Sequence, residues 1–357
     1  MNNKIKKPYR MATGVGSFPH KKVDEALDLI FTHLPLIPHW PQLPALSDSE
    51  GFVEQYLHPL VKIGAIKYKE QGSPYFDSEN SSFLDILTKF YELYLKAKDN
   101  EKEAGEHFVM SSKFASGFHS FTERLEKEGT GPALFLKGQI SGPVTVGLRL
   151  TDGKRQPSFY RQELRDLLTN TLELQLDWQI KELKKFGLPV IIFIDDPGLC
   201  FFGQASYIGL SREEIQESLR TLVETIHGLD ALAGVHVCSG IDWNILTELQ
   251  VDIINVDAVK YFEPLLVYID TFKEFYEKGG LMAWGVIPTD QRIEEENKET
   301  VLERLHNCLD TLSQKGIPRS QLEEQLMITP SCGTGTLTRE LGEKIYAILG
   351  EIQSKYL

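Results

Sequence analysis

Short apolar runs alternate with longer helical patterns along the second half of the chain. The apolar runs cover residues 133–140, 190–194, 231–238, 252–256, 281–286 and 326–329. Runs that are apolar on both faces, with helices between them, are typical of a parallel sheet whose two faces are both covered. The pattern therefore predicts a repeated strand–helix unit from residue 132 onward.

The first part of the chain follows this alternation less closely. Residues 11–15 predict a short strand and residues 24–34 a helix, while residues 39–44 predict a strand that Pro41 and Pro44 weaken because proline donates no backbone hydrogen bond. Residues 50–131 hold helical patterns and no clear strand. We interpret this segment as a helical insertion between the second and third strands. It is either a lid or dimer surface, or a decoration without a role in chemistry.

Adding the two early strands gives eight strand–helix units, and this number indicates an α/β fold of the (β/α)8 TIM barrel type. We expect one barrel domain over residues 1–357, with the insertion at about 50–131. A doubly wound open sheet is the alternative. It is disfavoured because no Gly-x-Gly-x-x-Gly loop follows the first predicted strand.

Charge and cysteine content narrow the possible partners. A net charge of -13 argues against nucleic acid and anionic membrane surfaces. No apolar run is long enough to span a membrane, and the basic N-terminus lacks the apolar segment of a signal peptide. We therefore expect a cytoplasmic protein. The chain has four sparse and unevenly spaced cysteines: Cys200, Cys238, Cys308 and Cys332. In the cytoplasm such cysteines are expected to be free thiols or metal ligands and not disulfides.

A histidine and a cysteine two residues apart end the apolar run at 231–238. Strand residues i and i+2 point to the same side, so His236 and Cys238 face one space at the C-terminal end of that strand. These ligand types suit Zn²⁺, although a buried cysteine beside a hydrogen-bonded histidine gives the same pattern. Cys332 follows the last predicted strand, and a barrel gathers all strand ends at one rim. Three such ligands with an open position are the pattern of catalytic zinc, which Asp257 could complete.

Two carboxylates and a serine follow other strands at the same rim. Carboxylates at the C-terminal end of a barrel strand favour a functional role, which makes Asp195 and then Asp196 candidates for contacting a substrate. Hydrogen bonding to the backbone is the structural alternative for Asp195, as capping of a turn is for Ser17. Cys308 lies in a helical pattern and is expected in the core, and Cys200 is assigned a structural role.

Six motifs occur in order and carry a family resemblance: Gly14-Val-Gly-Ser-Phe-Pro19, Ile140-Ser-Gly-Pro-Val-Thr145, Ile194-Asp-Asp-Pro197, His236-Val-Cys238, Asp252-Ile-Ile-Asn-Val-Asp257 and Thr329-Pro-Ser-Cys-Gly333. Together they resemble the C-terminal catalytic barrel of cobalamin-independent methionine synthase, within the wider uroporphyrinogen-decarboxylase-like group of barrels. The resemblance extends from about Ala12 to Leu349. The chain has no room for the additional N-terminal barrel of that family.

The resemblance implies a zinc-dependent methyltransferase of the 5-methyltetrahydropteroyltriglutamate–homocysteine S-methyltransferase kind. It places zinc on His236, Cys238 and Cys332, with Asp257 in a position where the family usually has Glu. It places homocysteine near Gly16 and Ser17, with its amino group on Asp195 and with Asp196 adjacent. Asp195 and His236 are the predicted catalytic residues of a thiol alkylation. The family's folate-contacting segments have no clear counterpart, so the donor is a folate, methylcobalamin or a methyl-corrinoid protein, and short single-barrel relatives favour the corrinoid.

Two other functions stay open. A decarboxylase acting on a porphyrinogen-like substrate would need a cationic cleft, and the segment 17–22 after the first strand holds no arginine, although Arg149 and Arg155 could serve. A non-catalytic zinc- or thiol-binding protein is the other alternative. It is motivated by the weak match of Asp48, Glu50 and Glu54 to the family's acidic motif after the second strand.

Overall fold

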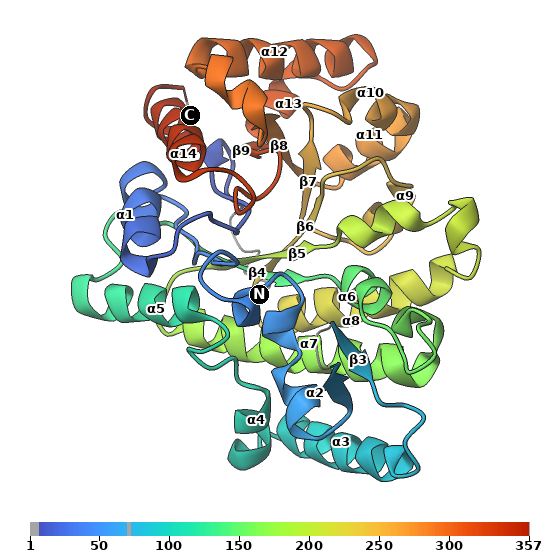
Figure 1. Cartoon of the computed structure of the whole chain (residues 1–357). Coiled ribbons are helices and arrows are strands. Elements are labelled where there is room, and N and C mark those ends of the chain that lie inside the picture. The colour runs from blue at the N-terminus through green and yellow to red at the C-terminus, as the bar shows by residue number, and fades with distance from the viewer. Residues whose placement is uncertain (1–6, 70–72, 357) are drawn as a thin grey trace.

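A curled, seven-stranded parallel sheet forms the centre of this α/β protein (Figure 1). The computed structural model describes residues 7–69 and 73–356. The strands lie in the order β1-β9-β8-β7-β6-β5-β4. Their bounds are β1 (Met11–Ala12), β4 (Leu136–Ser141), β5 (Val190–Asp195), β6 (Leu232–Val237), β7 (Ile253–Asp257), β8 (Leu281–Ile287) and β9 (Leu326–Pro330). All seven strands fall on apolar runs that predicted them.

Successive residues of these strands pack into two separate apolar cores. Along β5, Ile191 and Phe193 join an inner cluster with residues of six other segments, whereas Ile192 and Ile194 join the larger outer cluster against the helices. Strands β4 to β9 are buried at every position. Both faces of the sheet are therefore covered, which is why the strands read as continuous apolar runs instead of alternating ones.

Helices surround the sheet, and those after β4 follow the predicted alternation with it (Figure 1). They are α1 (Val23–His33), α6 (Pro143–Arg149), α7 (Gln162–Lys184), α8 (Arg212–Gly228), α9 (Asn244–Thr247), α10 (Phe262–Leu265), α11 (Ile269–Glu277), α12 (Lys298–Gln314), α13 (Arg319–Glu324) and α14 (Arg339–Lys355). Ser211 caps α8 through its hydroxyl, which accepts the N–H of Glu214 at 3.1 Å. Among the described residues, no helix has both the length and the apolar content that a membrane crossing needs.

One predicted helix is divided. The pattern over 265–278, with Pro264 at its start, predicted a single helix. In the structure Pro264 lies inside the short α10, and a 3₁₀ turn over Leu266–Tyr268 separates α10 from α11. Apolar residues on both sides of this turn keep a helical spacing, so the sequence pattern alone did not mark the break.

The predicted second strand, residues 39–44, does not form a continuous ladder. Isolated parallel bridges join His39 to Lys137 of β4 and Ser17, beyond β1, to Gln42. The segment thus touches both ends of the seven-stranded sheet. Three prolines without an N–H limit its pairing: Pro38, Pro41 and Pro44. Closure into an eight-stranded barrel stays a prediction beyond the observed sheet.

Residues 50–131 contain helices, as predicted, and also a hairpin that the prediction of no strand missed. The antiparallel strands β2 (Ile66–Tyr68) and β3 (Pro74–Phe76) pair with Ile66 opposite Phe76. Three residues are too few for an alternating pattern to stand out in a sequence. The helices are α2 (His58–Lys62), α3 (Phe83–Lys98), α4 (Lys102–Phe108) and α5 (Ser116–Glu128), and Figure 1 shows α2, α3, α4 and the hairpin gathered beyond α7.

Candidate metal centre

The structure brings together the three side chains that the sequence predicted to meet. One nitrogen of His236 and the sulfurs of Cys238 and Cys332 all lie within 4.8 Å of one another. His236 is in β6 and Cys238 directly follows that strand, whereas Cys332 follows β9. Strands β7 and β8 lie between β6 and β9 in the sheet, so it is the curl of the sheet that closes this distance.

Asn255 of β7 fixes the His236 ring. The Asn255 amide nitrogen donates to the carbonyl oxygen of Ala283 at 2.8 Å and to the hydroxyl of Thr329 at 2.7 Å. A carbonyl accepts and cannot donate, so the amide oxygen must face His236, whose Nδ1 lies 2.6 Å away. Nδ1 therefore carries the proton, and Nε2 presents a lone pair. Nε2 is buried and has no hydrogen-bond partner among the described residues.

The two thiols divide one negative charge unequally. The neighbouring Cys332 thiol and the His236 ring lower the pKa of Cys238 well below its ordinary value. The same contact, together with burial, raises the pKa of Cys332 well above its ordinary value. These contacts therefore favour the thiolate form of Cys238. A thiolate is the form of cysteine that binds a metal.

This donor set fits a metal ion. An orphaned buried imidazole nitrogen and two sulfurs are the ligands that zinc and other borderline or soft cations prefer. A tetrahedral ion with metal–sulfur bonds of about 2.3 Å separates its ligand atoms by about 3.8 Å. The present spacing of up to 4.8 Å needs a small side-chain adjustment to reach that value. The group can therefore hold one ion, which would leave a fourth position to another ligand.

Asp257, the predicted acidic ligand, lies at the end of β7 but outside this group. Its Oδ1 accepts the N–H groups of Val259 and Lys260, both at 3.0 Å, and so shapes the turn after the strand. Burial raises the pKa of Asp257, and the Cys238 sulfur nearby raises it further. Oδ1 of Asp257 thus stabilises the turn after β7, and metal ligation by Asp257 stays a prediction.

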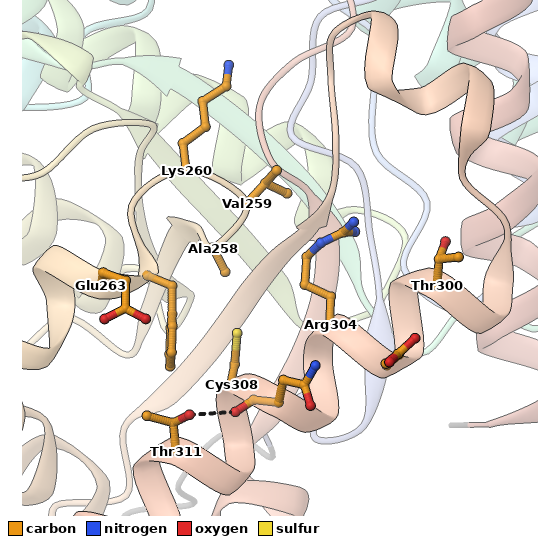
Figure 2. Close-up of a pocket in the computed structure, with 11 residues that line it drawn as sticks. Ala258, Val259, Lys260, Glu263, Thr300, Arg304, Cys308 and Thr311 are labelled. Carbon is orange, nitrogen blue, oxygen red and sulfur yellow. Dashed lines mark hydrogen bonds between the residues drawn. The ribbon is translucent and has the colours of Figure 1, made fainter.

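A cavity of about 530 Å³ adjoins the turn after Asp257 (Figure 2). Figure 2 shows Arg304 and Cys308 projecting from α12 toward the loop that carries Ala258. None of the three clustered ligands lines this cavity. Cys308 is 5% exposed and burial raises its pKa to about 12, so it is a core residue as predicted. Cys200, half-buried beside Ser239, is also outside the cluster.

The two neighbouring carboxylates after β5 have different environments. Asp196 accepts hydrogen bonds from the N–H of Val144 at 3.2 Å and from the N–H and hydroxyl of Thr145 at 2.8 and 2.6 Å, and so holds the start of α6. Asp195 is also buried, but its Oδ1 has no partner among the described residues. Burial raises the pKa of Asp195 to about 7 against the opposing effect of His236 and Lys137. Asp195 is the carboxylate with an oxygen left to bind a ligand.

Gly16 and Ser17 make structural contacts in the first loop. The Ser17 carbonyl accepts from both the N–H and the hydroxyl of Thr334 at 2.9 Å, and its hydroxyl accepts the N–H of Gly335 at 3.3 Å. A Cβ on Gly16 would lie 2.9 Å from the Gln139 side chain, which requires glycine there. The first loop is thereby tied to the loop of Cys332, and contact of Gly16 and Ser17 with a substrate stays a prediction.

Two buried polar residues beside the site, Asn255 and Lys137, were not predicted from the sequence. Both are fully buried and lie on the inward side of the sheet: Asn255 is two residues before Asp257, and Lys137 is two residues after Phe135 of the inner cluster. A polar residue inside an apolar strand needs a partner, because burying it alone is costly. A polar residue inside an otherwise apolar strand was therefore the sequence signal that could have identified Asn255 and Lys137.

Comparisons with known proteins leave the activity open. No protein-family model matches the chain, and no curated protein matches it. Among solved structures, a methyltransferase from Methanosarcina mazei is 13% identical, with 97% of this chain and 95% of that chain covered and a TM-score of 0.47. A Cellulomonas fimi endo-beta-1,4-mannanase double mutant is 14% identical, with 69% and 58% covered and a TM-score of 0.33. Likeness this distant assigns no activity, which has to come from the chain's own residues.

Proposed function

We propose that this protein is a zinc-dependent methyltransferase that methylates homocysteine to methionine, as a short relative of the cobalamin-independent methionine synthases. Two observations carry the proposal: one ring nitrogen of His236 and two cysteine sulfurs lie within 4.8 Å of one another, and the buried Nε2 of His236 has no hydrogen-bond partner among the described residues. Three such ligands leave a fourth position for an incoming thiol, which is the arrangement of catalytic zinc sites.

Zinc held by His236, Cys238 and Cys332 would lower the pKa of a substrate thiol and keep it as a thiolate at neutral pH. The protein groups supply the orientation. Asn255 holds the His236 lone pair toward the ion, and the unpartnered Oδ1 of Asp195 accepts an N–H of the substrate ammonium group. The buried surroundings keep water from the reacting sulfur, and fixed geometry raises its effective concentration.

The transfer itself is a displacement at carbon. The substrate sulfur attacks the methyl carbon of the donor, a carbon–sulfur bond forms, and the bond from that carbon to the donor breaks with its electron pair left on the donor. A methyl-folate would leave through nitrogen and a methyl-corrinoid through cobalt. The proposal names both donor classes, with a methyl-corrinoid as the first to be tested.

Methionine formation tests the proposal. Zinc-loaded protein is incubated with homocysteine and either methylcobalamin or 5-methyltetrahydropteroyltriglutamate, and methionine is measured by mass spectrometry. We expect formation with one donor class, lost in His236→Ala and Cys332→Ser and retained in Cys308→Ser. Homocysteine binding without turnover from any donor would instead indicate a binding protein, and release of carbon dioxide from uroporphyrinogen would indicate a decarboxylase.

A further inference from the structure

Lys137 of β4 is a fully buried lysine on the inner side of the sheet. Its Nζ donates to the carbonyl oxygen of Val15 at 2.6 Å and to Oε1 of Gln139 at 3.2 Å, and lies 4.5 Å from the centre of the Phe193 ring. Within residues 7–69 and 73–356 no carboxylate oxygen lies within 4.0 Å of it. A buried ammonium without an adjacent carboxylate is costly, so this lysine calls for an explanation.

The partner of Lys137 belongs to the loop that reaches the metal group. Val15 is buried, so its carbonyl depends on Lys137 for a hydrogen bond. Two residues later, the Ser17 carbonyl accepts both donors of Thr334, and Gly333 packs against Ser17 so closely that a Cβ there would lie 2.1 Å from the serine hydroxyl. Thr334 and Gly333 directly follow Cys332.

We propose that Lys137 is a positioning residue for the metal centre: it fixes residues 14–17, and through Ser17 and Thr334 it holds Cys332 toward His236 and Cys238. Cys332 needs such support because it follows β9, which two strands separate from β6 in the sheet. His236 and Cys238 share one strand end, where Asn255 also holds the His236 ring. This role rests on the proposed metal centre, and it assigns the placement of Cys332 to a lysine outside the three clustered side chains.

Lys137 can donate its hydrogen bond to Val15 whether its amine is charged or neutral. Asp195 follows Phe193 by two residues on the same side of β5, and its carboxylate favours the charged form of the lysine, whereas burial lowers the pKa of Lys137 to about 7. In its neutral form the amine still donates hydrogen bonds. The contact with Val15 therefore persists on both sides of neutral pH, as a positioning role requires.

Cobalt binding tests the inference in the full-length protein. Apo protein is titrated with Co²⁺, whose thiolate charge-transfer absorption reports on both cysteine ligands. In Lys137→Met, which keeps the length and removes the donor, we expect Co²⁺ affinity to fall about 10- to 100-fold, the range for residues that orient metal ligands. We also expect the absorption to fall to that of Cys332→Ser. Lys184→Met is the matched control, because Lys184 donates to the carbonyls of Leu229 and Asp230 outside the metal group, and it should behave as wild type.

Wild-type affinity and absorption in folded Lys137→Met would overturn the inference while leaving the metal centre intact. Absence of thiolate absorption in the wild type would overturn the metal centre and this inference together. If Lys137→Met does not fold, Thr334→Val removes the hydroxyl's 2.9 Å hydrogen bond to the Ser17 carbonyl and leaves the one from the backbone N–H of residue 334. Weakened Co²⁺ binding in Thr334→Val supports the path, and unchanged binding refutes it.

Discussion

Replacing Asn255 by leucine should disable the metal centre without touching a ligand. Asn255 is fully buried, and its amide oxygen is the acceptor for Nδ1–H of His236 at 2.6 Å. Leucine has a similar volume and no acceptor. The imidazole then loses the contact that keeps its proton on Nδ1, and a proton on Nε2 would remove the lone pair of that buried, unpartnered nitrogen.

The magnitude follows from two estimates that agree. A buried N–H left without an acceptor costs about 1–3 kcal/mol, which corresponds to a roughly 5- to 150-fold weaker equilibrium. Residues that orient a metal ligand typically change metal affinity by about 10- to 100-fold. We therefore expect Asn255→Leu to weaken zinc binding by about 10- to 100-fold.

Zinc affinity is measured by competition with a chromophoric chelator, with circular dichroism to establish that the variant folds. Gln325→Leu is the matched control: this buried amide donates to the carbonyls of Tyr276 and Gly280 at 3.2 and 3.0 Å, before β9 begins. It should lose stability and keep its zinc affinity. A folded Asn255→Leu protein with wild-type affinity would refute the argument that Asn255 sets the His236 tautomer.

Three further outcomes are expected. The pKa of Lys137 is lowered to about 7, against about 10.4 in an unfolded chain, so its contribution to stability is complete above the higher value and is lost as the pH falls through the lower one. Relative to Lys137→Met, the wild-type free energy of unfolding should thus rise between pH 7 and 10 by up to about 1.4 kcal/mol per pH unit. Urea denaturation at a series of pH values measures this, and the same pH dependence in both proteins would contradict it. Asp196→Asn should lower the free energy of unfolding by about 1–3 kcal/mol in urea denaturation, since an amide cannot accept at both ends; an unchanged midpoint would argue against its role at α6. Cys308→Ala should cost about 1 kcal/mol and leave zinc content unchanged, and loss of zinc would place Cys308 at the metal.

The sheet was predictable where burial is two-sided. Strands such as β5 and β8 are apolar on both faces, so their runs stand out in the sequence and their positions were correct to within a few residues. Elements that depend on few residues were not. The β2–β3 hairpin has three residues a strand, and the 39–44 segment pairs through isolated bridges between prolines. Neither leaves a periodic signal.

The meeting of His236, Cys238 and Cys332 was predictable from the sequence, whereas the contacts that support them were not. His236, Cys238 and Cys332 were identified because residue type and strand-end position point to one rim. The contacts of Asn255 with Ala283 and Thr329 join residues that are far apart in the chain. The contact of Asp196 with Thr145 of α6 does the same. Such partners follow from the register of neighbouring strands, which a single sequence does not specify.

X-ray absorption at the zinc edge, with and without homocysteine, distinguishes a substrate-binding zinc site from other uses of this cluster. We expect one nitrogen and two sulfur ligands from His236, Cys238 and Cys332, and one additional sulfur when homocysteine is present. Protein that binds no zinc, or a zinc shell that gains no sulfur on addition of homocysteine, would contradict this expectation.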